Sequence, residues 1–371
     1  MKKPIELADV VRRFGPAYLE SQGSRILPSQ KKALDDISAC RTAALGGHQY
    51  RCLSCDTTFW VYHSCRNRSC PACHGRETQR WLDERNAQVL GCGYYHIVVT
   101  VPPQIRSSFL ADQKRMYSLL MKVAAECVID LARDERFLGA TPAILSVLHT
   151  WTGDIQYHPH VHMLVSAGGV SDDGQYWKSP RNNKFLVPIK ALSALIRGRF
   201  RAHLERCAPD TLSALPDKVW RDGWNSFCKY FGKGADTILN YLGRYVFRIA
   251  ISNTRIVSMD ETHVTFRNNN GKSIRITGEE FLRRFVMHVL PRGFHKIRYY
   301  GLWHHSKQDL QKRARLLLEA TSRPEEIREL IELVTGDDFI REESFSPTCP
   351  RCASRSVIHL SELRRDRSPP L

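Results

Sequence analysis

The chain has 371 residues, 42% of them hydrophobic and 25% charged, a balance typical of a soluble globular protein with two or three domains. No run of about 18 apolar residues occurs and the N-terminus lacks the apolar stretch of a signal peptide, so we expect an intracellular protein with no membrane association. The formal net charge of +17 favours a polyanionic partner, most simply nucleic acid.

The N-terminal region predicts helix followed by a segment that cannot fold alone. Apolar side chains recur at helical spacing over residues 5–40, and Gly15-Pro16 is expected to bend or divide this stretch. Residues 40–75 are rich in Cys, Arg and Gly and poor in aliphatic side chains. Such a segment needs a cross-link in place of a hydrophobic core.

Metal is the expected cross-link, because disulfides are rare inside cells and six of the twelve cysteines fall in this segment. Cys52-x2-Cys55 and Cys70-x2-Cys73 predict a closed, structural, tetrahedral zinc site. A second zinc site, or simply buried side chains, is the alternative interpretation of a further set of residues: Cys40, His48, His63 and Cys65.

Two other features accompany the cysteines. Arg66 and Arg68 lie inside the motif, so the same segment is a candidate DNA-binding surface. Cys349-x2-Cys352 repeats half of the pattern near the C-terminus, either as a remnant or as a chelate completed elsewhere. Apart from this pair, the polar tail 341–371 is expected to be disordered.

The middle of the chain predicts an antiparallel sheet with flanking helices. Apolar or β-branched strands are expected at 94–101, 143–151 and 159–166, and the last two are expected to form a hairpin. A second group of short strands turns at Asn269-Asn270-Gly271. Its strands are expected at 254–258, 262–267 and 272–277, and helices are expected at 108–133, 188–206, 217–230, 235–248, 279–289 and 307–335.

Histidines alternate in the strand Tyr157-His-Pro-His-Val-His162. Residues two apart on a strand share a face, so His160 and His162 offer two imidazoles to one divalent metal. The competing interpretation is a group of core histidines satisfied by hydrogen bonds.

A catalytic metal needs a third ligand. If the hairpin sets 151 against 158, His149 lies opposite His160 on the same face and is the preferred third ligand. A slip of one residue would reverse the face. In that case the third ligand would come from His158, Asp154 or Gln156.

Two tyrosines four residues apart, Tyr241 and Tyr245, share one side of the expected helix 235–248. A tyrosine is more often a packing residue than a nucleophile. Here a candidate metal and the neighbouring Arg244 and Arg248 favour phenol attack on a phosphodiester. Attack would leave a 5′-phosphotyrosine and a free 3′-hydroxyl, and religation would need no ATP because the ester keeps the bond energy.

Taken together, these motifs resemble the two-tyrosine HUH transposases of the insertion-sequence 91 family, the rolling-circle type, over nearly the whole chain. The matching segments are Cys40-Arg-Thr-Ala-Ala-Leu-Gly-Gly-His48, Cys52-x2-Cys55, Ser64-Cys65-Arg-Asn-Arg-Ser-Cys70-Pro-Ala-Cys73, Leu148-His-Thr-Trp151, His158-Pro-His-Val-His162, Tyr241-Leu-Gly-Arg-Tyr245, Val289-Leu-Pro-Arg-Gly-Phe294 and Ile297-Arg-Tyr-Tyr-Gly301. One departure is Ser69, where the family commonly has His.

The resemblance implies an α+β HUH endonuclease fold, with a zinc-binding domain over 1–90, a nuclease over 91–310 and a helical extension over 311–371. It implies single-stranded DNA as substrate, Mg²⁺ or Mn²⁺ as catalytic ion on the histidines, one or two structural Zn²⁺, and the bacterial cytoplasm, at the nucleoid, as location. The sequence has no Gly-x4-Gly-Lys-Ser/Thr loop, so we expect host replication or helicase proteins to displace the strand.

Three rival functions fit part of the sequence. A replication initiator would use the same nicking chemistry. A histidine-triad nucleotide hydrolase would use the alternating histidines without a metal, but it would leave the tyrosine pair, the cysteines and the charge unexplained. A zinc-stabilised DNA-binding protein would need no catalytic tyrosine.

Overall fold

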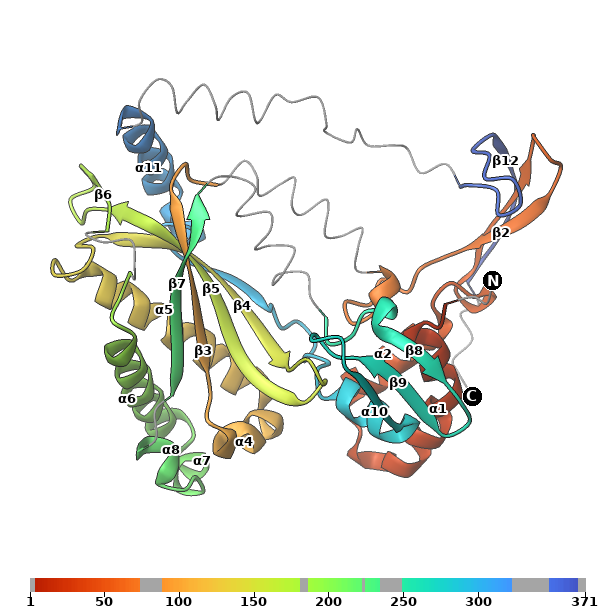
Figure 1. The fold of residues 1–371 in the computed structure, drawn as a ribbon, viewed down its shortest axis with the longest axis horizontal. Helices are drawn as coiled ribbons and strands as arrows, with labels where there is room; N and C mark the ends of the chain where they lie inside the picture. The colour runs from red at the N-terminus through yellow and green to blue at the C-terminus, as the bar shows by residue number, and fades with distance from the viewer. Residues whose placement is uncertain are drawn as a thin grey trace. The chain divides into compact units, whose positions relative to one another are not determined.

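The computed structural model describes residues 4–73, 89–180, 186–221, 224–233, 249–321 and 347–365. The chain divides into two compact units (Figure 1), and each is described by itself. The first unit comprises 1–77, 251–289 and 332–371, and the second comprises 78–250 and 290–331. The units therefore interleave along the chain, whereas the boundaries expected at residues 90 and 310 follow chain order.

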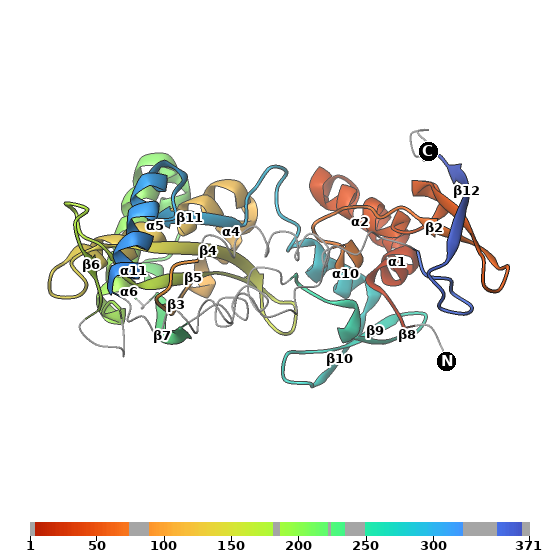
Figure 2. The ribbon, with the colours of Figure 1, turned by 90° about the horizontal axis from the view of Figure 1, so that it is seen from above.

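Among the residues that the structure describes, the first unit combines the helices α1, α2 and α10 with two small antiparallel sheets (Figure 2). Its elements are α1 (Leu7–Gln22), α2 (Pro28–Ala39), β1 (Gly47–Cys52), β2 (Thr58–Tyr62), β8 (Ile256–Met259), β9 (His263–Arg267), β10 (Ser273–Thr277), α10 (Gly278–Val286) and β12 (Val357–Leu363), with 3₁₀ turns at Gly23–Arg25, Ala43–Leu45 and Asn253–Arg255.

The core of this unit lies between α1, α2 and α10. Apolar side chains at helical spacing, such as Leu7, Val10 and Val11 on α1, are fully buried there. The helix continues through Pro16 and ends at Gly23, whose φ of 52° is the left-handed conformation typical of a helix terminus. The helix is therefore not divided at Gly15-Pro16, and the first interruption of the helical stretch is at Gly23.

Two sheets flank this core in the strand orders β12-β1-β2 and β10-β9-β8. The second sheet confirms the strands expected between 254 and 277, with Gly271 at φ 79° in the turn. The first sheet corrects the sequence prediction, because β12 lies in the tail that we expected to be disordered and pairs along the length of β1.

The second unit is an antiparallel sheet covered by helices. Its elements are β3 (Gly93–Thr100), α4 (Arg106–Ala111), α5 (Gln113–Arg133), β4 (Thr141–Trp151), β5 (Tyr157–Val170), β6 (Trp177–Lys178), α6 (Ile189–Cys207), α7 (Pro209–Ser213), α8 (Lys218–Arg221), β7 (Asn225–Lys233), β11 (Ile297–Gly301) and α11 (Gln308–Thr321), with 3₁₀ turns at Pro103–Ile105 and His305–Lys307. The strand order is β11-β4-β5-β3-β7, and β6 pairs with β5 beside this path.

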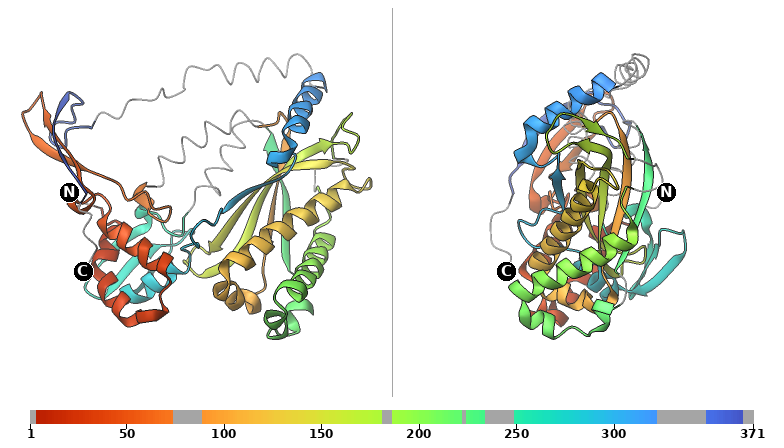
Figure 3. Two further views of the ribbon diagram at one scale, coloured as in Figure 1. Left: turned by 180° about the vertical axis from the view of Figure 1, so that it is seen from behind. Right: turned by 90° about the vertical axis from the view of Figure 1, so that its left-hand side faces the viewer.

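The two faces of this sheet are covered differently. Helices α4, α5 and α6 cover one face (Figure 3) and bury the aliphatic side chains that point toward them. On the other face, one end packs against α11 through a cluster that includes Tyr94, Leu145, Leu164 and Leu318. The fold class expected from the sequence, α+β with a central antiparallel sheet, is confirmed.

One sequence prediction in this unit is wrong. Residues 217–230 carry Trp220, Trp224 and Phe227 at helical spacing, yet only Lys218–Arg221 are helical and Asn225–Lys233 form the edge strand β7. Trp224 is buried against Phe200 of α6, and the following residues gain the backbone hydrogen bonds of β3. Sheet pairing thus overrides the helical spacing.

Candidate functional site

The alternating histidines lie on β5, a central strand of the second unit. β4 and β5 pair antiparallel with His149 directly opposite His160 and Val147 opposite His162. This register confirms the predicted position of His149, although Trp151 pairs with Tyr157 rather than with residue 158 because the ladder shifts between His149 and Trp151. Directly paired side chains share a face, so all three imidazoles meet.

The side chains of His149, His160 and His162 form one cluster, called here the histidine trio. One ring nitrogen from each lies within 4.8 Å of the other two. The ring centroids are 4.5 Å apart for His149 and His162, 4.8 Å for His160 and His162, and 5.5 Å for His149 and His160. Such a spacing allows all three residues to reach a single ion.

A hydrogen bond to the main chain fixes the orientation of the His160 ring. The Nδ1 of His160 donates to the backbone oxygen of His158 at 2.7 Å, which leaves its Nε2 available as a ligand. His158 itself, one of the alternative third ligands, stays outside the trio, with its ring 5.3 Å from that of His160.

A fourth histidine, His96 on β3, completes the arrangement. Its Nε2 lies 2.9 Å from Nδ1 of His162, and both side chains are buried. This hydrogen bond orients the His162 ring, as a hydrogen-bonded neighbour commonly orients a metal-binding histidine. Our sequence analysis missed this residue, because its position diagonal to His162 follows only from the pairing of β3 with β5.

The trio is buried at its base and more open at its rim. His149 and His162 are 3% and 8% exposed, whereas His160 is half-buried. Burial lowers the pKa of His160, and the nearby charge of Arg106 lowers it further. Burial also lowers the pKa of His96 and of His158, each to about 4. His96, His158 and His160 are therefore neutral at physiological pH, and the neutral imidazole is the form that binds metals.

Two side chains near the trio, Trp151 and Arg106, have the chemical character needed to contact a DNA strand. The ring of Trp151 stacks on His149 with centroids 4.6 Å apart, beside the trio. Arg106 of α4 is half-buried, and its Nε has no hydrogen-bond partner among the residues that the structure describes. A guanidinium in such a place can bind a phosphate oxygen.

The donor set of the trio fits a catalytic divalent ion. Three imidazoles from two adjacent strands approach from one side, and three protein ligands would leave other coordination positions of an ion for water and phosphate. Tyr241, Tyr245, Arg244 and Arg248 lie outside the described residues, so their placement relative to the trio stays a prediction.

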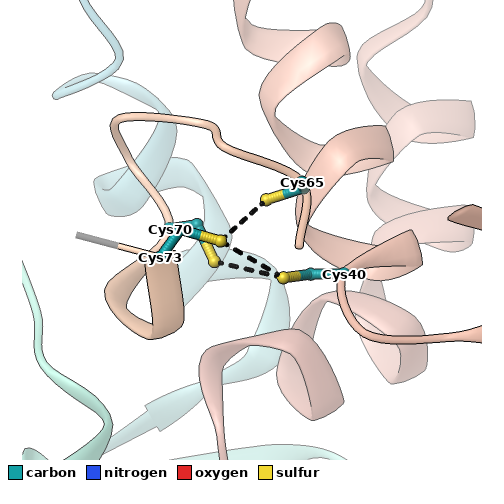
Figure 4. Close-up of side chains that lie close together, drawn as sticks. All are labelled: Cys40, Cys65, Cys70 and Cys73. Carbon is teal, nitrogen blue, oxygen red and sulfur yellow. Dashed lines mark hydrogen bonds between the residues drawn. The ribbon is translucent and has the colours of Figure 1, made fainter. Parts of the chain in front are cut away.

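In the first unit, Cys40, Cys65, Cys70 and Cys73 converge (Figure 4). Their Sγ atoms are 3.5 Å apart for Cys40 and Cys73, 3.6 Å for Cys65 and Cys73, and 3.8 Å for Cys40 and Cys70. Four sulfurs around a tetrahedral zinc at about 2.3 Å are about 3.8 Å apart, so the geometry fits Zn²⁺. This set is called here the first quartet.

The first quartet corrects the grouping that we expected. Cys70 and Cys73 join Cys40 and Cys65, whereas Cys52 and Cys55 lie in a separate cluster with Cys349 and Cys352, called here the second quartet. Close spacing of Cys-x2-Cys pairs in the sequence does not decide which pairs meet, because that depends on the path of the intervening chain.

The remaining predicted residues of this unit lie elsewhere. His48 belongs to neither quartet; it contacts His63 and His359, and its Nδ1 lies 3.3 Å from Nε2 of His359. Arg66 is exposed beside the first quartet, whereas Arg68 is half-buried and burial lowers its pKa.

The fold and these sites define a protein with a zinc-binding domain and a histidine-bearing sheet, and comparisons with known proteins agree. Residues 10–101 match the model of a transposase zinc-binding domain, and residues 143–310 match that of a putative transposase family. The first region contains the first quartet and the second contains the histidine trio.

Two relatives are similar over most of their length. The chain is 34% identical to putative transposase y4qJ of Sinorhizobium fredii, over 98% of this chain and 97% of that protein. It is 26% identical to the transposase for insertion sequence element IS801 of Pseudomonas savastanoi pv. phaseolicola, over 81% of this chain and 76% of that protein. The chain belongs to the insertion-sequence 91 family of transposases.

Two further searches gave no match. No solved structure matches the chain. No helix among the described residues is both long and apolar enough to cross a membrane.

Proposed function

We propose that this transposase nicks and rejoins single-stranded DNA at the ends of a mobile element through a 5′-phosphotyrosine intermediate, as in rolling-circle transposition. Membership of the family implies DNA as substrate and its cleavage as activity. The observation that carries the proposal is the meeting of His149, His160 and His162 on paired strands. The net charge of +17 supports a polyanionic substrate.

The trio holds the catalytic ion in this proposal. Mg²⁺ or Mn²⁺, when bound, polarises the scissile phosphate and offsets the charge that develops on it. Imidazole nitrogen is a poor ligand for Mg²⁺, which prefers oxygen, so we expect Mn²⁺ to support the reaction at lower concentration. His96 keeps His162 in the orientation that presents Nε2.

Tyr241 or Tyr245 supplies the nucleophile. Its hydroxyl oxygen forms a bond to phosphorus, the bond from phosphorus to the 3′-oxygen breaks, and that oxygen leaves as a 3′-hydroxyl after taking up a proton. Attack of another strand's 3′-hydroxyl on the phosphotyrosine reverses these steps and joins the strands. A second tyrosine allows a second cleavage while the first end is still held.

The chain's own residues also hold the strand. Arg244, Arg248 and Arg106 are proposed to bind phosphate oxygens, and Trp151 to stack on a base. Arg66, exposed beside the first quartet, and Arg68 would contact DNA outside the nuclease. Host replication or helicase proteins would supply the strand displacement.

The test is covalent capture of DNA. Full-length protein is incubated with labelled single-stranded DNA from an element end and Mn²⁺, then run on a denaturing gel. We expect a protein–DNA band that is absent with EDTA and absent from the double variant Tyr241→Phe, Tyr245→Phe. Tyr176→Phe, at an exposed tyrosine, is the matched control and should retain the band.

Two results would overturn the proposal. A covalent band that persists in the double variant would place the nucleophile elsewhere. Cleavage that is unaffected by EDTA would favour the metal-free chemistry of a histidine-triad hydrolase over a metal-dependent nuclease.

A further inference from the structure

The second quartet brings together cysteines from the two ends of the chain. The Sγ atoms of Cys52 and Cys352 are 3.5 Å apart, and those of Cys55 and Cys349 are 3.6 Å apart. These separations are too long for disulfides, and all four cysteines are free thiols. They are close to the sulfur–sulfur spacing of a tetrahedral thiolate site, about 3.8 Å, and they match those of the first quartet.

The two halves of the second quartet have the same backbone fold. In one half, the amide of Cys52 donates to the oxygen of Thr57, and the amide of Asp56 donates to the oxygen of Cys52. In the other half, the amide of Cys349 donates to Ser354, and that of Ala353 donates to Cys349. Two segments with unrelated intervening residues thus form the same turn, which presents two thiols on one side.

Backbone strain marks the same turns. Five non-glycine residues in the described part of the chain have a left-handed φ. Two of these, Asp56 and Ala353, both at 59°, directly follow the second cysteine of each half. Two more, Arg41 and Arg66, directly follow Cys40 and Cys65 of the first quartet. This conformation is unfavourable for a residue with a Cβ, because the side chain comes close to the following carbonyl oxygen. Its recurrence beside clustered cysteines in both quartets indicates a common purpose, the presentation of thiolates.

Main-chain pairing holds the two halves in register. β12 pairs antiparallel with β1, with Cys52 opposite Val357 at the end beside the quartet. The amide of Leu53 donates to the oxygen of Ser356, and the hydroxyls of Ser54 and Ser354 lie 2.8 Å apart.

We propose that Cys52, Cys55, Cys349 and Cys352 bind a second structural Zn²⁺, which fastens the C-terminal segment 347–365 to the N-terminal strands. Four thiolates close the coordination sphere, so the ion takes no part in the DNA reaction. The matched zinc-binding region ends at residue 101 and does not contain the C-terminal half of this site.

The need for a metal follows from the weak packing of β12. Its side chains are mostly exposed, including Ile358, Leu360 and Leu363, so little apolar burial offsets the entropy lost when the strand is ordered. The site also closes a loop of 294 residues between Cys55 and Cys349. The cost of loop closure grows only logarithmically with length, so the free energy of zinc binding can exceed it.

One consequence concerns incomplete chains. The site requires both the segment with Cys52 and Cys55 and the segment with Cys349 and Cys352, so it forms only when a chain contains both. A truncated product that ends before Cys349 would keep the first quartet and lose the second ion.

Zinc content of the reduced full-length protein tests this assignment. We expect two zinc ions per chain in the natural protein, one in Cys349→Ser with Cys352→Ser, and one in Cys52→Ser with Cys55→Ser. The variant with all four substitutions should also keep one, because both pairs hold the same ion. Cys207→Ser, at an exposed cysteine outside both quartets, should keep two.

Hydrogen exchange is the second measurement, and it does not depend on zinc content. In the Cys349→Ser, Cys352→Ser protein we expect amides of 357–363 to exchange at least about ten-fold faster, with the rate at β4 and β5 unchanged. Two ions retained by this variant would overturn the proposal, as would unchanged exchange of β12. Loss of a further ion in the four-fold variant relative to the two double variants would show that the pairs bind separate ions.

Discussion

The histidine trio and the cysteine quartets differ in what holds their side chains in place. His149, His160 and His162 lie on neighbouring strands in the middle of a six-stranded sheet whose opposite face is packed against helices. Hydrogen-bonded backbone therefore fixes them with or without a metal. In the first quartet, Cys40 lies at the end of α2, Cys65 and Cys70 lie where residues 63–70 form neither helix nor strand, and Cys73 lies in the short helical segment that follows.

This difference separates two uses of a metal. At the trio, a bound ion adds chemistry to a scaffold that is already folded. At the quartets, it replaces the core that the surrounding segment lacks, because few aliphatic side chains are available there. Removing the metal from the trio should therefore abolish activity, whereas removing it from the quartets should unfold the segments around them.

The largest effect is expected from breaking the first quartet. Cys70 is fully buried, so Cys70→Ser removes a thiolate from a closed site whose ion contributes of order 10 kcal/mol in small zinc domains. We expect amides of residues 40–73 to lose protection from hydrogen exchange, while those of β4 and β5 keep it. Cys207→Ser is the matched control. If residues 40–73 stayed protected after the substitution, the first quartet would not be a structural zinc site.

The next largest effect is expected at the trio, where a substitution should lower activity and leave the fold unchanged. His149→Ala should lower the rate of DNA cleavage at least about 100-fold, because a ligand of the catalytic ion is lost. The cleavage rate should fall while protection of residues 40–73 stays as in the natural protein. His158→Ala is the matched control: it lies on β5, outside the trio, and this variant should stay within a few-fold of the natural rate. Equal losses in both variants would argue against the trio as the metal site.

The same contrast explains what the sequence could predict. The trio comes from one hairpin, so the alternation of apolar and histidine residues predicted that His160 and His162 share a face. The place of His149 opposite His160 depended on an assumed register, which the strand pairing confirms at that position. The quartets depend on contacts between distant segments. Cys52 meets Cys352 across 300 residues, and no local pattern carries that information. His96 is an intermediate case, because its strand was predicted but the neighbour of that strand was not.

The error at β7 has a related cause. Trp220, Trp224 and Phe227 recur at helical spacing, but Trp224 is buried against α6 just before the chain joins the sheet edge. A window of about ten residues does not reveal the open edge of β3 that receives β7. The spacing of apolar residues predicted the elements whose buried faces are set by their own sequence. It failed for β7, whose conformation depends on pairing with the distant strand β3.

A smaller effect is expected from His96. His96→Phe removes the partner of His162 Nδ1 but keeps an aromatic ring in the buried position. We expect the Mn²⁺ concentration for half-maximal cleavage to rise about 10- to 100-fold, with the rate at saturating Mn²⁺ changed much less. His96→Gln, which can still accept a hydrogen bond, should restore part of the affinity. A loss of rate that excess Mn²⁺ did not rescue would mean that His96 does more than position His162.

The smallest effect concerns the pH dependence of metal binding. Protons compete with the ion for imidazole nitrogen, so affinity falls as the pH drops through the pKa of the ligands. Burial, and then the charge of Arg106, lower the pKa of His160, which extends metal binding to lower pH than a free imidazole would allow.

Arg106→Ala removes the positive charge near His160, so the pKa of His160 should rise. The loss of Mn²⁺ affinity should then begin at higher pH, by less than about one unit. Arg206→Ala, on an exposed part of α6, should leave the onset unchanged. Titrations of Mn²⁺ affinity between pH 5 and 8 measure the onset, and a shift toward lower pH in Arg106→Ala would contradict the electrostatic coupling between Arg106 and the trio.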